Sequence, residues 1–129
     1  MLRTEKSRYA KSRITGLDVS SIVTKMEKIL TIDQLLRDPT LRLPDLARAL
    51  DIPAYQLSEI LNNVVQKSFR EYINGLRIQT AQRSFTVDPD ADIDTVMREN
   101  GFRSRSVFNH AFKSQTGQTP VEFNRSSQK

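Results

Sequence analysis

Polar side chains recur at helical spacing near the end of this chain, and their types suit hydrogen bonding to a nucleic acid. Ser104 can cap a helix by accepting from backbone amides of its first turn, and Gly117 can close that helix in the left-handed conformation. The face opposite the apolar positions carries Arg105, Ser106, Asn109, His110 and Lys113. These side chains donate or accept hydrogen bonds at the reach that a nucleic-acid groove requires. A packed pair of helices with a polar outer face fits the same pattern equally well.

Catalytic and metal-binding chemistry has little support elsewhere in the sequence. The chain has no Cys and a single His, which excludes thiolate sites, disulfides and a zinc cluster. Acidic residues alternate from Asp88 to Asp94, but the run lacks the central Gly and later Glu of a calcium loop. There is no Gly-rich phosphate loop and no Ser, His and Asp set at a nucleophile turn. We therefore expect no enzyme activity, no metal and no cofactor.

Charge is concentrated at the two ends of the 129-residue chain. The net charge is +5 and the isoelectric point is near 9.8, which favours acidic partners such as nucleic acid or an anionic membrane surface. Residues 101–129 hold five basic side chains and one acidic one, and residues 1–16 hold the same numbers. We expect residues 1–16 to be a flexible basic tail or linker, either a solvated leader or an arm that contacts DNA.

Length and hydropathy predict a small soluble protein. The chain is long enough for a hydrophobic core but too short for a large pocket. No apolar run approaches the roughly 20 residues of a membrane span, and no signal-peptide core follows Met1. We therefore expect a cytoplasmic protein, and we expect no membrane contact by this segment.

Start and stop signals place the polar face on the second helix of a helix-turn-helix. Asp92 can cap a helix over residues 93–100, and Gly101 allows the tight turn that follows. The helix that begins after Ser104 completes the motif over about 92–116.

A second helix-turn-helix is predicted earlier in the chain, over about 43–64. Pro44 and Pro53 each suit the first turn of a helix. Leu57 and Ile60 lie on the inward side of the helix that follows Pro53. The outward side of this helix carries the candidate DNA-binding residues Tyr55, Gln56, Ser58 and Glu59.

Three further helices complete an all-α prediction. A capping box formed by Ser68 and Glu71 starts a linker helix over about 68–85. An additional N-terminal helix is expected from about residue 19 to residue 30. Thr119 and Glu122 form a last capping box, so a short final helix should reach about residue 124 or 125. Residues 17–129 are thus predicted to form one domain of two helix-turn-helix units joined by a long helix.

The two helix pairs repeat each other along the sequence. An offset of 50 residues aligns Leu46, Arg48 and Ile52 with Val96, Arg98 and Phe102. An offset of 51 then aligns Leu57, Leu61, Ser68 and Tyr72 with Phe108, Phe112, Thr119 and Phe123. A one-residue insertion in the second turn explains the change, and the shared caps favour duplication over chance. Two outward helices on a linker suit successive major grooves about 34 Å apart, so the repeat favours DNA binding over a helical protein-interaction module.

These residues resemble the AraC/XylS (arabinose-regulator) family of bacterial transcription factors. The resemblance spans roughly residues 40–125. Its motif residues are Phe69–Asn74, Arg77, Ala81, Gly101, Phe102, Ser104, Ser106, Phe108, Asn109, Phe112, Lys113, Gly117, Thr119 and Pro120. It implies sequence-specific binding of double-stranded DNA, RNA polymerase as a partner, and a role in transcription regulation as an activator, with repression left open. It also implies a sensor or dimerisation region that this chain lacks, and the segment from Tyr9 to Leu61 looks like members that carry a sensor or membrane region before the DNA-binding domain.

The resemblance implies different roles along the second recognition helix. Arg105, Ser106, Asn109 and His110 face base edges, whereas Ser104 and Lys113 lie nearer phosphates. Arg can bind guanine through two hydrogen bonds and Asn can bind adenine, while Lys mainly neutralises phosphate.

Three departures from the family pattern limit this transfer. Met97 replaces a small Ala between the helices of the second unit, and wider or rearranged packing is expected there. Gln66 stands where a Gly usually ends the first recognition helix, so that cap is either strained or built differently. Glu59 replaces a residue that is often basic, and it either accepts from cytosine or repels phosphates.

Overall fold

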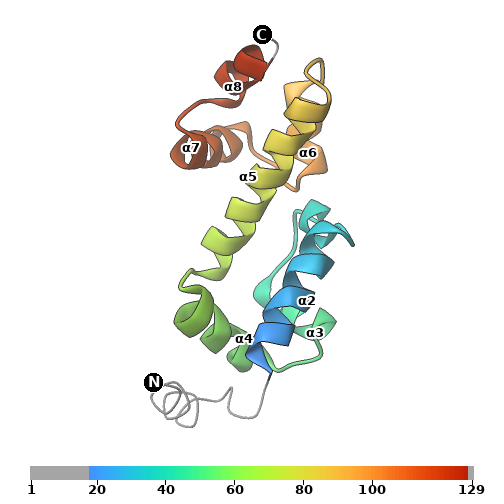
Figure 1. Cartoon of the computed structure of the whole chain (residues 1–129), viewed down its shortest axis with the longest axis vertical. Helices are drawn as coiled ribbons and strands as arrows, with labels where there is room; N and C mark the ends of the chain where they lie inside the picture. The colour runs from blue at the N-terminus through green and yellow to red at the C-terminus, as the bar shows by residue number, and fades with distance from the viewer. Residues whose placement is uncertain (1–17, 128–129) are drawn as a thin grey trace. The chain divides into compact units, whose positions relative to one another are not determined.

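The computed structural model describes residues 18–127, and within that range the chain forms helices and connecting turns without strands (Figure 1). The longer helices are α2 (Val19–Thr31), α5 (Phe69–Val87), α7 (Arg105–Thr116) and α8 (Pro120–Ser127). The shorter elements are η1 (Leu35–Arg37), α3 (Leu43–Ala49), α4 (Ala54–Ile60), η2 (Leu61–Val65) and α6 (Ile93–Glu99). The all-α prediction is confirmed. The basic segment 1–16 lies outside the described residues.

The described chain divides into two compact units. The first contains residues 18–33 and 41–70, and the second contains residues 34–40 and 71–127. Helices α2, α3 and α4 with η2 therefore belong to the first unit. The second contains η1, most of α5, and α6 to α8. The short segment 34–40 belongs to the second unit although it lies between two helices of the first.

Helices α2, α6 and α8 begin at side-chain caps, of which those at Asp92 and at Thr119 with Glu122 are the ones expected from the sequence. Asp18 and Asp92 each accept a hydrogen bond from the amide three residues further on, at 3.1 and 3.0 Å. Thr119 and Glu122 form a reciprocal capping box, with amide-to-side-chain distances of 2.8 and 3.2 Å. Each cap satisfies one of the first-turn amides that have no partner within the helix, and the caps fix where α2, α6 and α8 begin. Helix α8 continues to Ser127, slightly beyond its predicted end.

An aromatic core holds the second unit together. Phe85 of α5 and Phe112 of α7 are fully buried, and their ring centroids lie 6.1 Å apart in an edge-to-face arrangement. Met97 belongs to the same cluster and is 7% exposed, so the larger side chain is accommodated inside the core. The cluster consists of Ile78, Ala81, Phe85, Val96, Met97, Phe102, Phe108 and Phe112. This packing anchors α6 and α7 on α5.

A buried arginine attaches segment 34–40 to the second unit. Arg77 of α5 donates from Nε to the carbonyl of Leu36 at 2.9 Å and from Nη2 to the carbonyl of Asp38 at 2.7 Å. Burial lowers the pKa of Arg77 below its ordinary value, but a guanidinium group remains charged in proteins. Gly101 packs on this contact, because a Cβ there would lie 2.3 Å from the carbonyl oxygen of Leu36.

The duplication inferred from the sequence is visible in the backbone. Helices α3 and α6 are seven residues each and begin 50 residues apart, whereas α4 and α7 begin 51 residues apart. Positive φ values occur at matching turn positions, +58° at Asp51 and +85° at Gly101. They also occur at matching helix ends, +63° at Gln66 and +85° at Gly117. The offset thus changes in the turn, as predicted.

Helix α4 ends differently from α7. After Ile60 the chain forms the π-helical segment η2, and the carbonyl of Leu61 accepts from the amides of both Gln66 and Lys67. Gln66 nevertheless adopts the left-handed conformation that Gly117 adopts at the end of α7. The departure expected at Gln66 therefore takes both of the forms named above. The last turn of the helix is rebuilt, and the residue in the left-handed conformation carries a Cβ.

Candidate nucleic-acid interface

Helix α7 is fixed at both ends and along its inner side. The hydroxyl of Ser104 accepts from the amide of Val107 at 3.3 Å, and Gly117 ends the helix in the left-handed conformation. Phe108 and Phe112 are completely buried. Because its inner side and its ends are held in this way, α7 presents a defined face to solvent.

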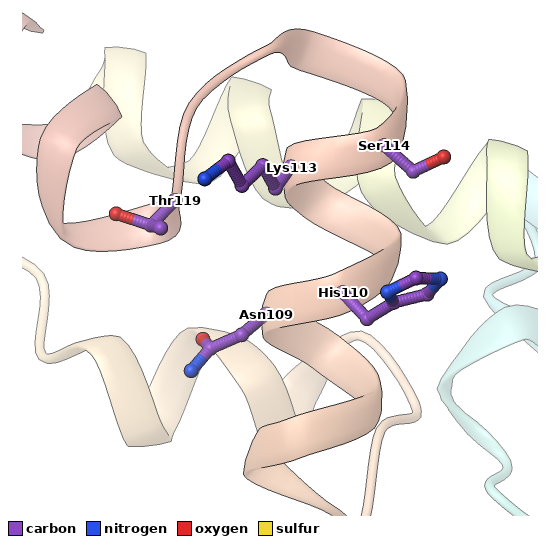
Figure 2. Close-up of a pocket in the computed structure, with 5 residues that line it drawn as sticks. All are labelled: Asn109, His110, Lys113, Ser114 and Thr119. Atoms are coloured by element: carbon purple, nitrogen blue, oxygen red, sulfur yellow. The ribbon is translucent and has the colours of Figure 1, made fainter.

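Polar side chains leave the outer face of α7 in two directions (Figure 2). Asn109 and Lys113 lie on the side of the turn that carries Thr119, whereas His110 and Ser114 lie on the other side. All five residues line an open hollow of about 470 Å³. They offer amide, ammonium, imidazole and hydroxyl groups, which are the groups that proteins use to bind base edges and phosphates.

The first turn of α7 adds two further predicted site residues. Arg105 donates from Nε to Oδ1 of Asp94 at 3.1 Å, and its Nη2 donates to the same oxygen. The Arg105 side chain is 57% exposed and the Asp94 side chain is 42% exposed. Ser106 is also exposed, and its hydroxyl lies 3.0 Å from that of Ser104. The structure therefore brings Arg105 and Ser106 to the exposed start of α7, with Arg105 already bound to a carboxylate.

The predicted residues of the first unit lie together on α4. Tyr55 is 44% exposed, whereas Gln56, Ser58 and Glu59 are only partly exposed. The inward position of Leu57 is confirmed, since its side chain is fully buried. The polar face of α4 is thus less accessible than the polar face of α7.

Three residues near the polar face of α7 are not among the site residues predicted from the sequence. The sequence identifies Thr119 as a cap and Asp94 as a member of an acidic run, and it gives no signal that either lies beside α7. Helical spacing does provide a signal for Ser114, which follows His110 by four residues on the same helix.

Residues 18–127 contain neither a cluster of metal-ligand side chains nor a helix that could span a membrane. In that range no group of three or more His, Cys, Asp or Glu side chains is arranged to hold a metal ion. The described helices also include none with the length and apolar character needed to cross a membrane.

Solved structures of bacterial regulators share this fold. The C-terminal domain of AraT, a response regulator from Geobacillus stearothermophilus, has a TM-score of 0.68 and 21% identity over 89% of this chain and 88% of that chain. A DNA-binding transcriptional dual regulator from Escherichia coli K-12 has a TM-score of 0.68 and 21% identity over 80% and 91%. The C-terminal domain of the two-component response regulator yesN from Fusobacterium nucleatum has a TM-score of 0.67 and 19% identity over 81% and 98%.

Sequence comparison adds a family assignment. A comparison with curated proteins gave no match. The family model described as a helix-turn-helix domain matches residues 46–126, which include the end of α3 and all of α4 to α7. Together with the duplicated backbone and the shared fold, this match identifies the family. The chain belongs to the AraC-type helix-turn-helix family.

Proposed function

We propose that this chain is the DNA-binding domain of a bacterial transcription regulator and that α7 reads base edges in a major groove. The proposal rests on the outer face of α7, which carries exposed polar side chains. The helix itself is held in place by the Ser104 cap, by Gly117 and by the aromatic core. Arg105 and Asn109 have the donors and acceptors that suit guanine and adenine. Lys113 supplies a charge suited to phosphate.

We further propose that α4 enters a second major groove on the same duplex, so that one molecule covers nearly two helical turns. The matching bounds of the two helix pairs support this, since α4 corresponds to α7 in the repeat. Helix α5 has 19 residues and is about 28 Å long, which suits grooves about 34 Å apart. A footprint confined to one groove would contradict the two-groove arrangement.

The second helix-turn-helix and the residues after it are expected to provide most of the phosphate affinity. Residues 101–129 carry a net charge of +4, from five basic and one acidic side chain, whereas residues 43–67 carry two basic and three acidic ones. Phosphate contacts release counterions, so binding should weaken steeply as salt rises. A flat salt dependence would favour the alternative of a helical protein-interaction module.

The test begins with selection of bound sequences from a random duplex pool. Arg105→Ala should then cost about 1–3 kcal/mol on the selected duplex and relax preference at one base pair, as loss of a two-hydrogen-bond base contact does. Arg83→Ala is the charge-matched control, because it removes an exposed arginine from α5. It should lower affinity for all duplexes alike. Tyr55→Ala should weaken binding less than Arg105→Ala, and the reverse order would refute the dominance of the second helix-turn-helix.

RNA polymerase as a partner and a sensor region elsewhere in the protein remain predictions from the family resemblance. So does the role as an activator. A transcription assay with purified polymerase and the selected duplex tests the contact with RNA polymerase and the role as an activator.

A further inference from the structure

The contact between Asp94 and Arg105 joins the first turns of two helices whose positions are fixed. Asp94 lies in the first turn of α6, which the Asp92 cap and the buried Val96 hold in place. Arg105 is the first residue of α7, directly after its cap. A carboxylate in the first turn of α6 is favourable to that helix, while the cation at the start of α7 is not. The ion pair offsets the second effect and restrains an otherwise mobile side chain.

The way in which Asp94 binds leaves one edge of the guanidinium group available. A guanidinium group has five N–H donors, one on Nε and two on each terminal nitrogen. Asp94 accepts from Nε and Nη2, which form one edge of the plane. The remaining edge, formed by Nη1 and the second hydrogen of Nη2, has the parallel pair of donors that fits O6 and N7 of guanine. The contact therefore orients Arg105 without occupying the donors that guanine requires.

We propose that Asp94 is a positioning residue that sets the base specificity of Arg105. This inference rests on the proposed function, because it assumes that α7 reads a major groove. An arginine held in its binding geometry loses less side-chain entropy on binding, and ordering one such side chain changes affinity by about two- to tenfold. Asp94 is also a negative charge near the DNA, so it lowers affinity for every sequence alike. Its removal should therefore have two effects of opposite sign.

The experiment compares Asp94→Ala with Asp90→Ala on the selected duplex, on its single-base-pair variants and on a scrambled duplex. Asp90 is an exposed carboxylate of the same acidic run, so the control removes an equal charge without touching Arg105. Both variants should bind the scrambled duplex more tightly. Only Asp94→Ala should lower the ratio of selected to scrambled affinity, by about two- to tenfold, with the loss at one base pair. Equal ratios for the two variants would overturn the inference.

A second variant separates positioning from a structural role. In the Arg105→Lys background the fork of donors is absent, so Asp94→Ala should no longer change the ratio at that base pair. NMR of the free protein should also show a dispersed Arg105 Nε–H signal that moves to the exposed-arginine region in Asp94→Ala. An unmoved signal would show that the contact is not formed in solution and would overturn the inference.

The outcomes distinguish this inference from the function on which it rests. If the unaltered protein selects no duplex sequence, the proposed function fails and the inference fails with it. If the protein selects a sequence that Asp94→Ala reads with unchanged preference, the inference fails alone.

Discussion

Replacement of Gly101 by Ala should destabilise the protein much more than the same replacement at Gly117. Both glycines have a φ of +85°, so both substitutions place a Cβ in the left-handed region. Their surroundings differ. A Cβ at Gly101 would lie 2.3 Å from the carbonyl oxygen of Leu36 and 2.6 Å from Nε of Arg77, whereas a Cβ at Gly117 would have no neighbour within 4 Å.

The expected magnitudes follow from these surroundings. The left-handed conformation costs an Ala about 1–2 kcal/mol, which is the whole expected cost at Gly117. At Gly101 the new methyl group must also displace the carbonyl of Leu36 or the side chain of Arg77. A hydrogen bond from a charged donor contributes about 1.5–3 kcal/mol. With one such bond lost, Gly101→Ala should cost about 2.5–5 kcal/mol, a large share of the 5–15 kcal/mol typical of small proteins.

Urea unfolding followed by circular dichroism measures the difference between the two variants. Gly117→Ala serves as the control, because it carries the same backbone strain without the close contact. The reasoning is refuted if the two substitutions lower the free energy of unfolding by amounts that agree within about 0.5 kcal/mol.

Three further predictions concern single side chains. Gln66→Gly should raise the free energy of unfolding by about 0.5–1 kcal/mol, since Gly adopts the observed φ of +63° without a Cβ; a loss of stability in urea would refute this. Glu59→Ala should raise affinity for selected and scrambled duplexes by the same factor, because a charge that repels phosphates is removed; weaker binding to the selected duplex alone would mean that Glu59 reads a base. Hydrogen bonds from the backbone amide of Thr119, and then from its hydroxyl, lower the pKa of Glu122. The ionised carboxylate therefore stabilises the fold at pH values above its ordinary pKa. This stabilisation is lost as the pH falls through the lowered pKa. Thr119→Ala removes only the hydroxyl and should raise the pKa of Glu122 part of the way, which carboxyl NMR titration measures; an unchanged pKa would count against the capping box.

Local features of this fold could be predicted from the sequence because their partners lie close along the chain. Asp92 and Ser104 each cap a helix through an amide three residues further on, so type and spacing suffice to identify them. The burial of Phe108 and Phe112 follows from helical periodicity in the same way. The family resemblance and the internal repeat extended these local signals to the whole domain.

Contacts between distant residues could not be predicted by these means. Arg77 binds the carbonyl of Leu36, which lies 41 positions earlier, and no local pattern marks a carbonyl as its partner. Asn100 accepts a hydrogen bond from the hydroxyl of Thr80, which lies 20 positions earlier, and an apolar pattern does not reveal this contact.

The candidate site shows the same limit. Helical spacing places Arg105 on the outer face of α7, but it cannot show that Asp94 of another helix binds it. That contact depends on how α6 and α7 pack, and packing is set by the aromatic core rather than by the polar residues themselves. The base-reading roles of the α4 and α7 residues remain predictions.

The attachment of segment 34–40 to the second unit has a consequence for how this domain can evolve. Duplicated halves can be inherited or exchanged separately when each is a continuous stretch of chain. Here the second half contains seven residues that precede most of the first half, and Arg77 depends on two of their carbonyls. A recombination event between η2 and Arg77 would therefore separate Arg77 from its partners and leave a buried charge unsatisfied. Once that contact had formed, the two copies could diverge on the outer faces of α4 and α7, but an exchange before Arg77 would cost the second copy two of its contacts.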